Sequence, residues 1–353
     1  MPKNILFVGD LNFYSKGASR LSAVRRLGAD VVGISHAPIG GDDLGFVPPS
    51  LSFRIVWKMG IHRDTENVNS QIIEQVKALK PDLLWIEKGN MIKPATLKKV
   101  QNLSPDTIIV SYSDDDMFNK LNRTHAYTDG LKHYDVVFTT KSYNANTDEL
   151  PALGAKRCVM VDKAYDPSQH MPMDLDATDR ETYGADVGFI GSYAPERAEI
   201  IQYLAENDIQ IRVWGNGWQG VLSTSPNLQI ERQPLVNTRD DLKFSKGICA
   251  TRINLGFLRK VNRDLQTDRS VEIPACGGFM LAERSAEHER LFEDAKEAVY
   301  FDTNKDLLEK IRYFLSHEDE RKTIGLAGRA RCESSGYSHL GRMRFMLKEA
   351  LGG

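Results

Sequence analysis

Short apolar segments alternate with helix-like segments along most of this chain, and no other feature of the sequence constrains the fold as strongly. The pattern opens with an apolar run at residues 5–8, a helical period over 15–27 and a second apolar run at 30–34. Short apolar runs are typical of buried strands. Helices between them favour parallel pairing, because the chain must return to the starting end of the sheet. We therefore predict an α/β fold built on parallel, doubly wound sheets.

The alternation continues through both halves of the chain. In the first half we expect further helices at 68–79, 94–103 and 127–132 and strands at 81–87, 107–112 and 135–139. In the second half we expect strands at 186–190, 210–214, 228–231, 253–256, 279–281 and 298–301 and helices at 195–207, 239–245, 270–276 and 305–316. Residues 318–351 read as helical, with a break near 334–337.

The length of 353 residues favours two domains, because one domain usually holds roughly 100–200 residues. Residues 171–185 (MPMDLDATDRETYGA) are polar and rich in turn formers, so we place a linker there. This leaves an N-terminal Rossmann-like domain at 1–170, a C-terminal one at 186–335 and a terminal helix at 336–353. Two such sheets in succession are expected to face a central cleft that receives ligands at the carboxyl ends of the strands.

Lysine and arginine (46) nearly balance aspartate and glutamate (48), which gives a net charge of −2. The chain lacks the bulk attraction that binding to nucleic acid needs, so nucleic acid is not expected as a partner. The four cysteines are far apart and lack ligand spacing, which favours reduced thiols and no metal site. No export signal and no run of about 18 apolar residues is visible. We expect a cytoplasmic protein without an integral membrane segment, at most peripheral to the inner face of the membrane.

The segment DVGFIGSYAPER at 186–197 reads as a strand, a glycine turn at Gly191 and Ser192, and a helix that begins near Pro195. Backbone N–H groups at such a helix start attract anions, and Arg197 adds positive charge suited to a diphosphate. The alternative is a plain tight turn with a solvated Arg197. The segment is not G-x-G-x-x-G, so the fingerprint of dinucleotide binding is absent.

The sequence WGNGW at 214–218 follows an expected strand. Gly215 permits a close approach of the backbone, and Trp214 offers a flat face on which a nucleotide base can stack. The alternative is that both tryptophans are core residues beside a turn.

A basic loop precedes the expected helix at 270–276. Its cations are Arg259, Lys260, Arg263 and Arg269. Glu272 stands at the start of that helix, and Gly277 and Gly278 follow its end. A cationic loop suits a diphosphate, and a carboxylate beside it can accept hydrogen bonds from two ribose hydroxyls. The alternative is an exposed basic loop and a glutamate that only favours the helix dipole.

An acidic cluster follows the expected strand at 107–112. Asp114 and Asp115 lie in this cluster, and His125 comes shortly after it. These residues are candidates for the general base that activates an acceptor hydroxyl; a divalent-cation site or simple helix capping are the alternatives. The loop at 9–17 (GDLNFYSKG) closes the first strand and is expected at the same edge of the sheet.

Two segments together resemble a known family. VGFIGSYAPER (187–197) and RSVEIPACGGFML (269–281) are similar to the CgeB-like, or spore-maturation-protein-like, group of the glycosyltransferase family 1 superfamily. The second segment resembles the superfamily helix E-A-x-A-x-G-x-P-V-V, whose glutamate binds the ribose of the donor. The resemblance assigns that role to Glu272, and it assigns the donor diphosphate to Gly191 and Arg197. The superfamily has a second glutamate seven residues upstream, where this chain has Leu265.

The resemblance implies a GT-B fold and a metal-independent transfer from a nucleotide-diphosphate sugar, with a UDP-sugar as the expected donor. It also implies that the terminal helix crosses back to the first domain. The acceptor stays open among a glycan, a protein, a lipid-linked sugar and a small molecule. Two alternatives remain on the same scaffold: a nucleotide-sugar epimerase or hydrolase, and a non-catalytic two-domain ligand-binding protein.

Overall fold

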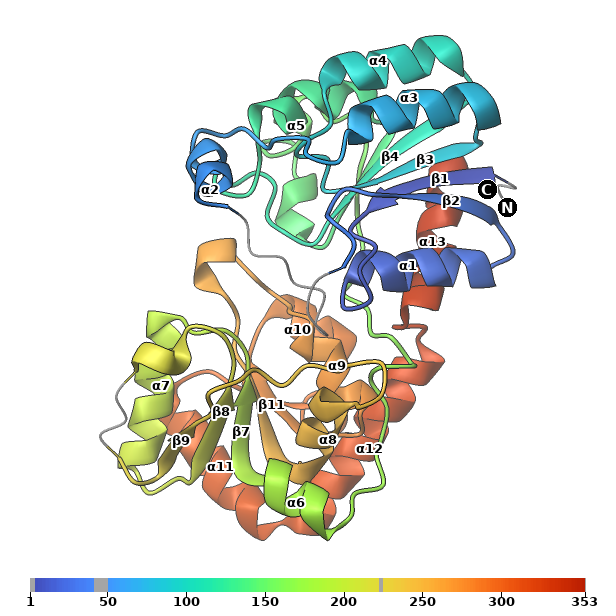
Figure 1. Cartoon of the computed structure of the whole chain (residues 1–353). Coiled ribbons are helices and arrows are strands. Elements are labelled where there is room, and N and C mark those ends of the chain that lie inside the picture. Colours follow the sequence, from blue (N-terminus) through green and yellow to red (C-terminus); the bar gives the residue numbers. More distant parts are fainter. Residues whose placement is uncertain (1–3, 41–49, 222–224, 353) are drawn as a thin grey trace. The chain divides into compact units, whose positions relative to one another are not determined.

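The computed structural model describes residues 4–40, 50–221 and 225–352. They form two compact α/β units (Figure 1). The first unit comprises Met1–Asp162 together with His339–Gly353, and the second comprises Lys163–Ser338. None of the helices in the described ranges is long and apolar enough to cross a membrane.

The first unit is built on a six-stranded parallel sheet in the order β2-β1-β3-β4-β5-β6. Its strands are β1 (Asn4–Gly9), β2 (Asp30–Ser35), β3 (Leu83–Glu87), β4 (Ile108–Ser113), β5 (Val136–Thr139) and β6 (Cys158–Met160). Its helices are α1 (Lys16–Arg26), α2 (Leu51–Lys58), α3 (Val68–Leu79), α4 (Pro94–Leu103), α5 (His125–Gly130) and α13 (His339–Leu351).

Both faces of this sheet are covered, and successive apolar residues of β1 point to opposite faces. Ile5 and Phe7 of β1 share a core with α1 and α13, whereas Leu6 and Val8 share a core with α3, α4 and α5. A strand buried on both faces carries a continuous apolar run, which explains the signal in the sequence. Polar side chains that meet a ligand over this sheet are therefore expected at the ends of its strands.

The second unit repeats this architecture with the strand order β12-β11-β10-β7-β8-β9, again all parallel. Its strands are β7 (Ala185–Ile190), β8 (Ile211–Trp214), β9 (Leu228–Ile230), β10 (Thr251–Gly256), β11 (Met280–Glu283) and β12 (Val299–Phe301). Its helices are α6 (Ala177–Tyr183), α7 (Pro195–Glu206), α8 (Lys243–Ala250), α9 (Arg269–Ala275), α10 (Ala286–Leu291), α11 (Asn304–Ser316) and α12 (Glu318–Ser334).

The structure divides the chain differently from the sequence-based expectation. The units meet at Asp162 and Lys163, and helix α6 lies inside the segment 171–185 that the sequence predicts as a linker. The side chain of Asp176 caps this helix by accepting a hydrogen bond from the backbone N–H of Asp179. A short polar helix lacks the apolar period by which helices are recognised in a sequence. The polar composition of residues 171–185 therefore predicted a linker.

The terminal helix α13 belongs to the first unit. It packs against α1, and its buried residues Met343, Met346 and Leu347 complete the core on that face of the sheet. The preceding helix α12 ends at Ser334, and Gly336 has a left-handed φ of 66° that turns the chain between the two helices. The chain therefore returns to its starting unit through a short glycine turn.

We expect Met343→Ala to lower the free energy of unfolding of the first unit by about 2–5 kcal/mol, because it removes a fully buried side chain from the sheet-facing side of α13. Phe345→Ala on the same helix is the control: Phe345 is 42% exposed, so we expect a loss below about 1 kcal/mol. Native-state hydrogen exchange of the first-unit strands measures both effects. Equal losses in the two variants would contradict the assignment of α13 to this core.

Candidate functional site

In each sheet the chain adds strands first on one side of its first strand and then on the other side. The place between these two sides is the topological switch point. In the second unit this switch point lies between β7 and β10, since β8 and β9 follow on one side and β11 and β12 on the other. Ligands of open α/β sheets bind beyond the carboxyl ends of the strands at such points. The turn after β7, the end of β8 and the loop after β10 meet there.

A glycine contact closes the turn after β7. The backbone N–H of Gly191 donates to the carbonyl of Trp214 at 2.9 Å. A Cβ at Gly215 would lie 2.0 Å from the carbonyl oxygen of Gly191, so only glycine fits that position. Ser192 lies in this same turn, which leads to the start of α7. Glycine is therefore needed here for the close approach of two backbone segments.

Trp214 and its neighbour Trp218 are both buried in the second unit, in separate apolar clusters. The indole N–H of Trp218 donates to the carbonyl of Gly191 at 2.9 Å. This geometry favours the core interpretation of Trp214 over a platform for a nucleotide base.

Arg197 is a buried brace across the switch point. Its guanidinium donates to the carbonyls of Ser192 and Phe257, each at 3.0 Å, and lies 5.5 Å from the ring centre of Phe189. Burial lowers its pKa, and repulsion from Arg259 lowers it further. Both terminal nitrogens of the Arg197 guanidinium donate to backbone carbonyls. This geometry favours a role in holding the turn after β7 against the end of β10 over a role in binding a ligand.

The loop after β10 carries the exposed cations. Arg259, Lys260 and Arg263 are all exposed. They lie in or beside a short 3-10 turn at Lys260–Asn262. The backbone N–H groups of Asn262 and Asp264 both donate to the carbonyl of Arg259, which closes the loop. These side chains can therefore reach an anionic group without breaking the core.

Glu272 is the buried carboxylate of this region. It lies in the first turn of α9, where Arg269 pairs with one carboxylate oxygen and the Nε2 atom of His170 lies 3.6 Å from the other. The Nδ1 atom of His170 accepts a hydrogen bond from the backbone N–H of Asp166, so the neutral imidazole carries its proton on Nε2, facing Glu272. Arg269 thus orients the carboxylate, and the imidazole of His170 lies beside its other oxygen.

Arg269 is itself fixed from two sides. Its Nε atom donates to the carbonyl of Ile190 at 2.8 Å, and its guanidinium lies 4.4 Å from the ring centre of Phe244. This ties Glu272 to the end of β7. His170 and Phe244 could not be recognised as site residues from the sequence, because their contacts join segments far apart in the chain.

Gly277 and Gly278 do not join this group. Helix α9 runs back from the carboxyl edge of the sheet, so the turn at its end lies at the opposite edge, before β11 begins. Gly277 ends the helix with a left-handed φ of 74°, and a Cβ at Gly278 would lie 2.6 Å from Ile248 of α8. Their expected role in donor binding is corrected to a packing role.

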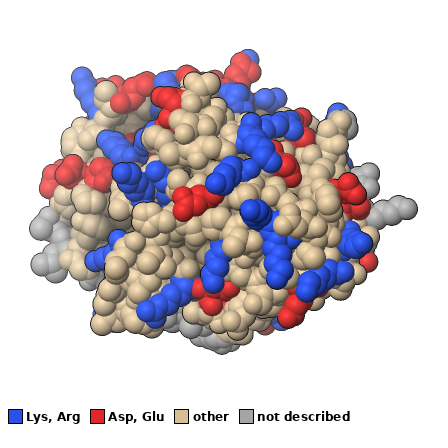
Figure 2. All heavy atoms as spheres, turned by 90° about the horizontal axis from the view of Figure 1, so that it is seen from above, with Lys and Arg blue, Asp and Glu red and all other residues tan. Residues whose placement is uncertain are grey.

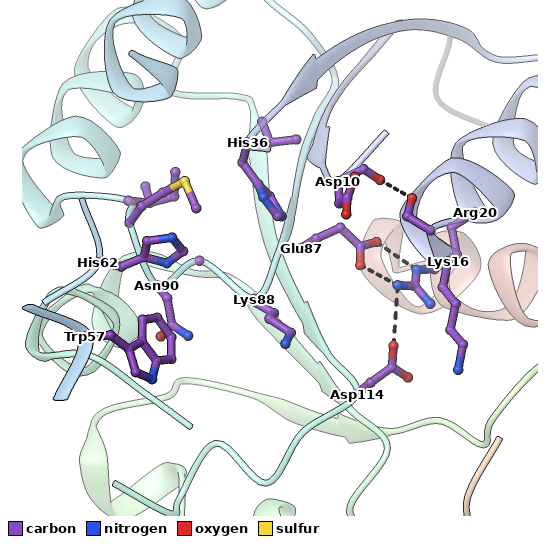
Figure 3. Close-up of a pocket in the computed structure, with 16 residues that line it drawn as sticks. Asp10, Lys16, Arg20, His36, Trp57, His62, Glu87, Lys88, Asn90 and Asp114 are labelled. Carbon is purple, nitrogen blue, oxygen red and sulfur yellow. Dashed lines mark hydrogen bonds and ion pairs between the residues drawn. The ribbon is translucent and has the colours of Figure 1, made fainter. Parts of the chain in front are cut away.

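The first unit has its switch point between β1 and β3, and a pocket of about 370 Å³ lies there. Figure 3 shows its polar side chains pointing toward one another from the ends of these strands and from α1. The polar and aromatic residues that line the pocket include Asp10, Lys16, Arg20, His36, Trp57, His62, Glu87, Lys88, Asn90 and Asp114.

A buried ion pair organises the pocket. Arg20 of α1 donates from Nε and Nη2 to the two carboxylate oxygens of Glu87, at 2.8 and 2.5 Å, and the indole N–H of Trp85 donates to the same carboxylate. Burial alone would lower the pKa of Arg20, but the charge of Glu87 raises it overall. Arg20 therefore keeps its positive charge, and bidentate geometry fixes its orientation against Glu87.

The structure separates the three catalytic candidates of the sequence. Asp114 lines the pocket, where its oxygens accept from the Tyr112 hydroxyl at 2.8 Å and lie 3.5 Å from Nη2 of Arg20. Asp115 instead forms an ion pair with Lys88 at 2.6 Å. His125 lines a different pocket beside α5, so the structure does not bring it together with Asp114.

Two histidines of the first pocket were missed from the sequence. His36 follows β2, and His62 lies edge-on to Trp57 with 5.0 Å between ring centres. The Nδ1 atom of His62 is buried and has no hydrogen-bond partner among the described residues. Burial lowers the pKa of both histidines, to about 4 for His62. Both rings are therefore neutral near pH 7.

Comparison with known proteins shows which family one segment of the chain is similar to and which solved structures share its fold. Residues 197–348 match the family described as Glycosyl transferase-like. A sequence search of curated proteins found no match. Among solved structures, the chain resembles sucrose-phosphate synthase (tll1590) from Thermosynechococcus elongatus, with 11% identity over 99% of both chains and a TM-score of 0.64.

Two further structures share the fold. HepE (Alr3699) of Anabaena in complex with UDP-glucose has 10% identity over 100% of both chains and a TM-score of 0.59. A putative UDP-N-acetylglucosamine 2-epimerase from Listeria monocytogenes has 10% identity over 98% of this chain and 95% of that chain, with a TM-score of 0.55. At such identities the likeness establishes the fold alone.

These findings define the chain as a GT-B α/β protein with a glycosyl transferase-like domain. The matched segment runs from Arg197 in α7 into α13 and includes the exposed basic loop and Glu272. The family match covers less than half of the chain, so it characterises this segment and not the whole protein.

We expect the free energy of unfolding to fall as pH is lowered from 6.5 toward 4, partly through His62. Its folded pKa is depressed, so the unfolded chain binds more protons in this window and stability rises with pH. His62→Gln should remove a part of this dependence of the order of 2 kcal/mol. Urea unfolding of both proteins across the window measures it, and identical profiles would contradict the burial of His62.

Proposed function

We propose that this protein is a glycosyltransferase that moves a sugar from a nucleotide-diphosphate sugar, a UDP-sugar in the first instance, to an acceptor hydroxyl. The observation that carries the proposal is Glu272, a buried carboxylate held by Arg269 and His170 at the switch point of the second unit. It lies within the segment that matches a glycosyl transferase-like family. The segments at 187–197 and 269–281 support a place in the CgeB-like group.

The donor roles follow from which groups are fixed and which are exposed. Glu272 accepts hydrogen bonds from the two ribose hydroxyls, since each oxygen of a carboxylate can accept more than one hydrogen bond. Arg259, Lys260 and Arg263 on the exposed loop neutralise the diphosphate. Their charge stabilises the leaving group as negative charge develops on it.

The acceptor is held in the first-unit pocket. The acceptor oxygen forms a bond to the anomeric carbon while the bond from that carbon to the diphosphate oxygen breaks. We assign the acceptor's proton to Asp114, because this carboxylate lines the pocket and is oriented by Tyr112 and Arg20. The Nδ1 atom of His62, which has no hydrogen-bond partner in the described part of the chain, supplies a hydrogen-bonding atom for a substrate hydroxyl.

We expect one nucleotide sugar among UDP, GDP, ADP, CMP and dTDP sugars to raise the melting temperature of the wild type. At about 100 times its Kd, a ligand stabilises the folded state by ~2.7 kcal/mol. Glu272→Gln should reduce this rise, since the amide keeps the shape but removes the charge that accepts the ribose hydroxyls. Glu309→Gln on α11, far along the sequence and exposed, is the control. No response to any of these sugars in the wild type would overturn the proposal.

Release of nucleoside diphosphate distinguishes the alternatives on this scaffold. The fold is shared with a putative UDP-N-acetylglucosamine 2-epimerase, so donor turnover without acceptor is the outcome expected of an epimerase or hydrolase. A glycosyltransferase needs an acceptor for rapid release. Saturable binding without any product is the outcome expected of a ligand-binding protein.

We propose that the reaction needs no metal ion, because the cationic loop supplies the positive charge at the diphosphate. EDTA should leave the rate of transfer unchanged. Arg259→Ala and Lys260→Ala should each lower kcat/KM by roughly 10-fold or more, since each removes a cation that acts on the leaving group. Loss of activity in EDTA, restored by Mg²⁺ or Mn²⁺, would contradict this part of the proposal.

A further inference from the structure

Helix α2 has an unusual composition for its surroundings. Five of its eight residues (LSFRIVWK) are apolar, yet none of its residues is buried. Ser50 caps its first turn by accepting a hydrogen bond from the N–H of Phe53. Packing in the core of the first unit therefore does not account for the apolar side chains of this helix.

One side of α2 is nevertheless fixed. The rings of Phe53 and Trp57 lie 6.4 Å apart and nearly parallel, and His62 meets both edge-on at 5.0 Å. These contacts set the rotation of the helix about its axis. The opposite side is consequently held toward solvent.

That solvent side carries an apolar stripe. Leu51, Ile55 and Met59 are spaced by four residues, so they follow one face of the helix and its last turn. Their exposed fractions are 72%, 55% and 64%. Leu121, on the segment before α5, is 71% exposed and adds a fourth protruding apolar side chain.

Basic side chains accompany this stripe. Arg54 and Lys58 are exposed and also spaced by four residues along α2. At the end of the helix, a pocket of about 400 Å³ is lined by Lys58, Lys120, Arg123 and one carboxylate, that of Asp129. Three cations against one carboxylate leave a local charge of about +2 near pH 7, with His125 at the rim.

The apolar stripe and the basic side chains together indicate which kind of partner fits this surface. An acidic surface without an apolar layer would match the lysines and leave the stripe in water, whereas a neutral apolar partner would bury the lysines unpaired. A bilayer with anionic lipids matches both, since apolar side chains enter the acyl boundary and the lysine stems reach the phosphates. The net charge of −2 gives no bulk attraction, and Figure 2 shows basic and acidic side chains interspersed on one face. Recognition must therefore be local.

We propose that the α2 surface, formed by Leu51, Ile55, Lys58, Met59, Lys120 and Leu121, docks the protein on an anionic lipid bilayer. The proposal does not depend on the donor chemistry of the second unit. It assigns the polar pocket beside α5 to lipid phosphate groups and the stripe to the acyl boundary.

Vesicle flotation of the full chain tests the proposal. We expect binding to vesicles of phosphatidylcholine mixed with phosphatidylglycerol, loss of binding at high salt, and no binding to phosphatidylcholine alone. Replacing the stripe (Leu51→Ser, Ile55→Ser and Met59→Ser together) should weaken binding at least ~10-fold. Lys58→Glu with Lys120→Glu should weaken it at least ~25-fold, since each lysine contributes about fivefold near an anionic surface and each glutamate adds repulsion.

The controls use matched exposed residues of the second unit. Leu326→Ser on α12, where the leucine is 65% exposed, and Lys305→Glu on α11 should leave vesicle binding unchanged. All the replaced side chains are exposed, so circular dichroism should show folded variants. Failure to float with anionic vesicles, or full binding by the stripe variant, overturns the proposal. Complete release by soluble glycerol phosphate also overturns it, in favour of a site for a small anion.

Discussion

Parallel pairing of strands buried on both faces is the constraint on which the rest of this structure depends. Such strands consist of apolar residues, so each unit can place functional polar groups only where its strands end. Because the chain adds strands first on one side and then on the other, one gap between adjacent strand ends is left without a crossing connection. In both units an arginine is buried at that gap.

An arginine crosses the switch point in each unit. Arg20 lies in the helix that follows β1 and reaches Glu87 at the end of β3, which is the strand across the gap. Arg197 lies in the helix that follows β7 and reaches the carbonyl of Phe257, just after β10, again across the gap. The two arginines therefore occupy corresponding places in the two units, although the partner is a carboxylate in one and backbone carbonyls in the other.

The sequence predicted most of the elements whose signal is local. The strands and long helices of both units follow from apolar runs and helical periods. Helices α2 and α6 were missed because neither has a buried side, and strand β6 because its three residues are only partly buried. The expected helix at 239–245 begins later, at Lys243, since residues 238–241 form a turn in which Thr238 and Asp241 exchange hydrogen bonds.

The site was less predictable, because it depends on contacts between distant segments. Glu272 and the basic loop stand out by type and spacing, but His170 and Glu87 become recognisable only when the fold brings them to Glu272 and Arg20. Arg197 shows the opposite case: its sequence context suits an anion, while its burial assigns it to the backbone. Residue type therefore indicated which side chains suit an anion, and burial in the structure showed which of these cations are exposed.

The division between buried and exposed charges has a physical consequence for ligand binding. A buried arginine with fixed partners has lost its side-chain freedom during folding, so it adds orientation without a further entropy cost when a ligand arrives. Arg259 and Lys260 are exposed in the loop after β10. Ordering them on a diphosphate would cost free energy that their Coulomb attraction would have to exceed. Glu272 is positioned by Arg269 and His170 before any ligand binds. Recognition of a nucleotide would thus combine a fixed carboxylate, which sets geometry, with an adaptable basic loop, which responds to charge.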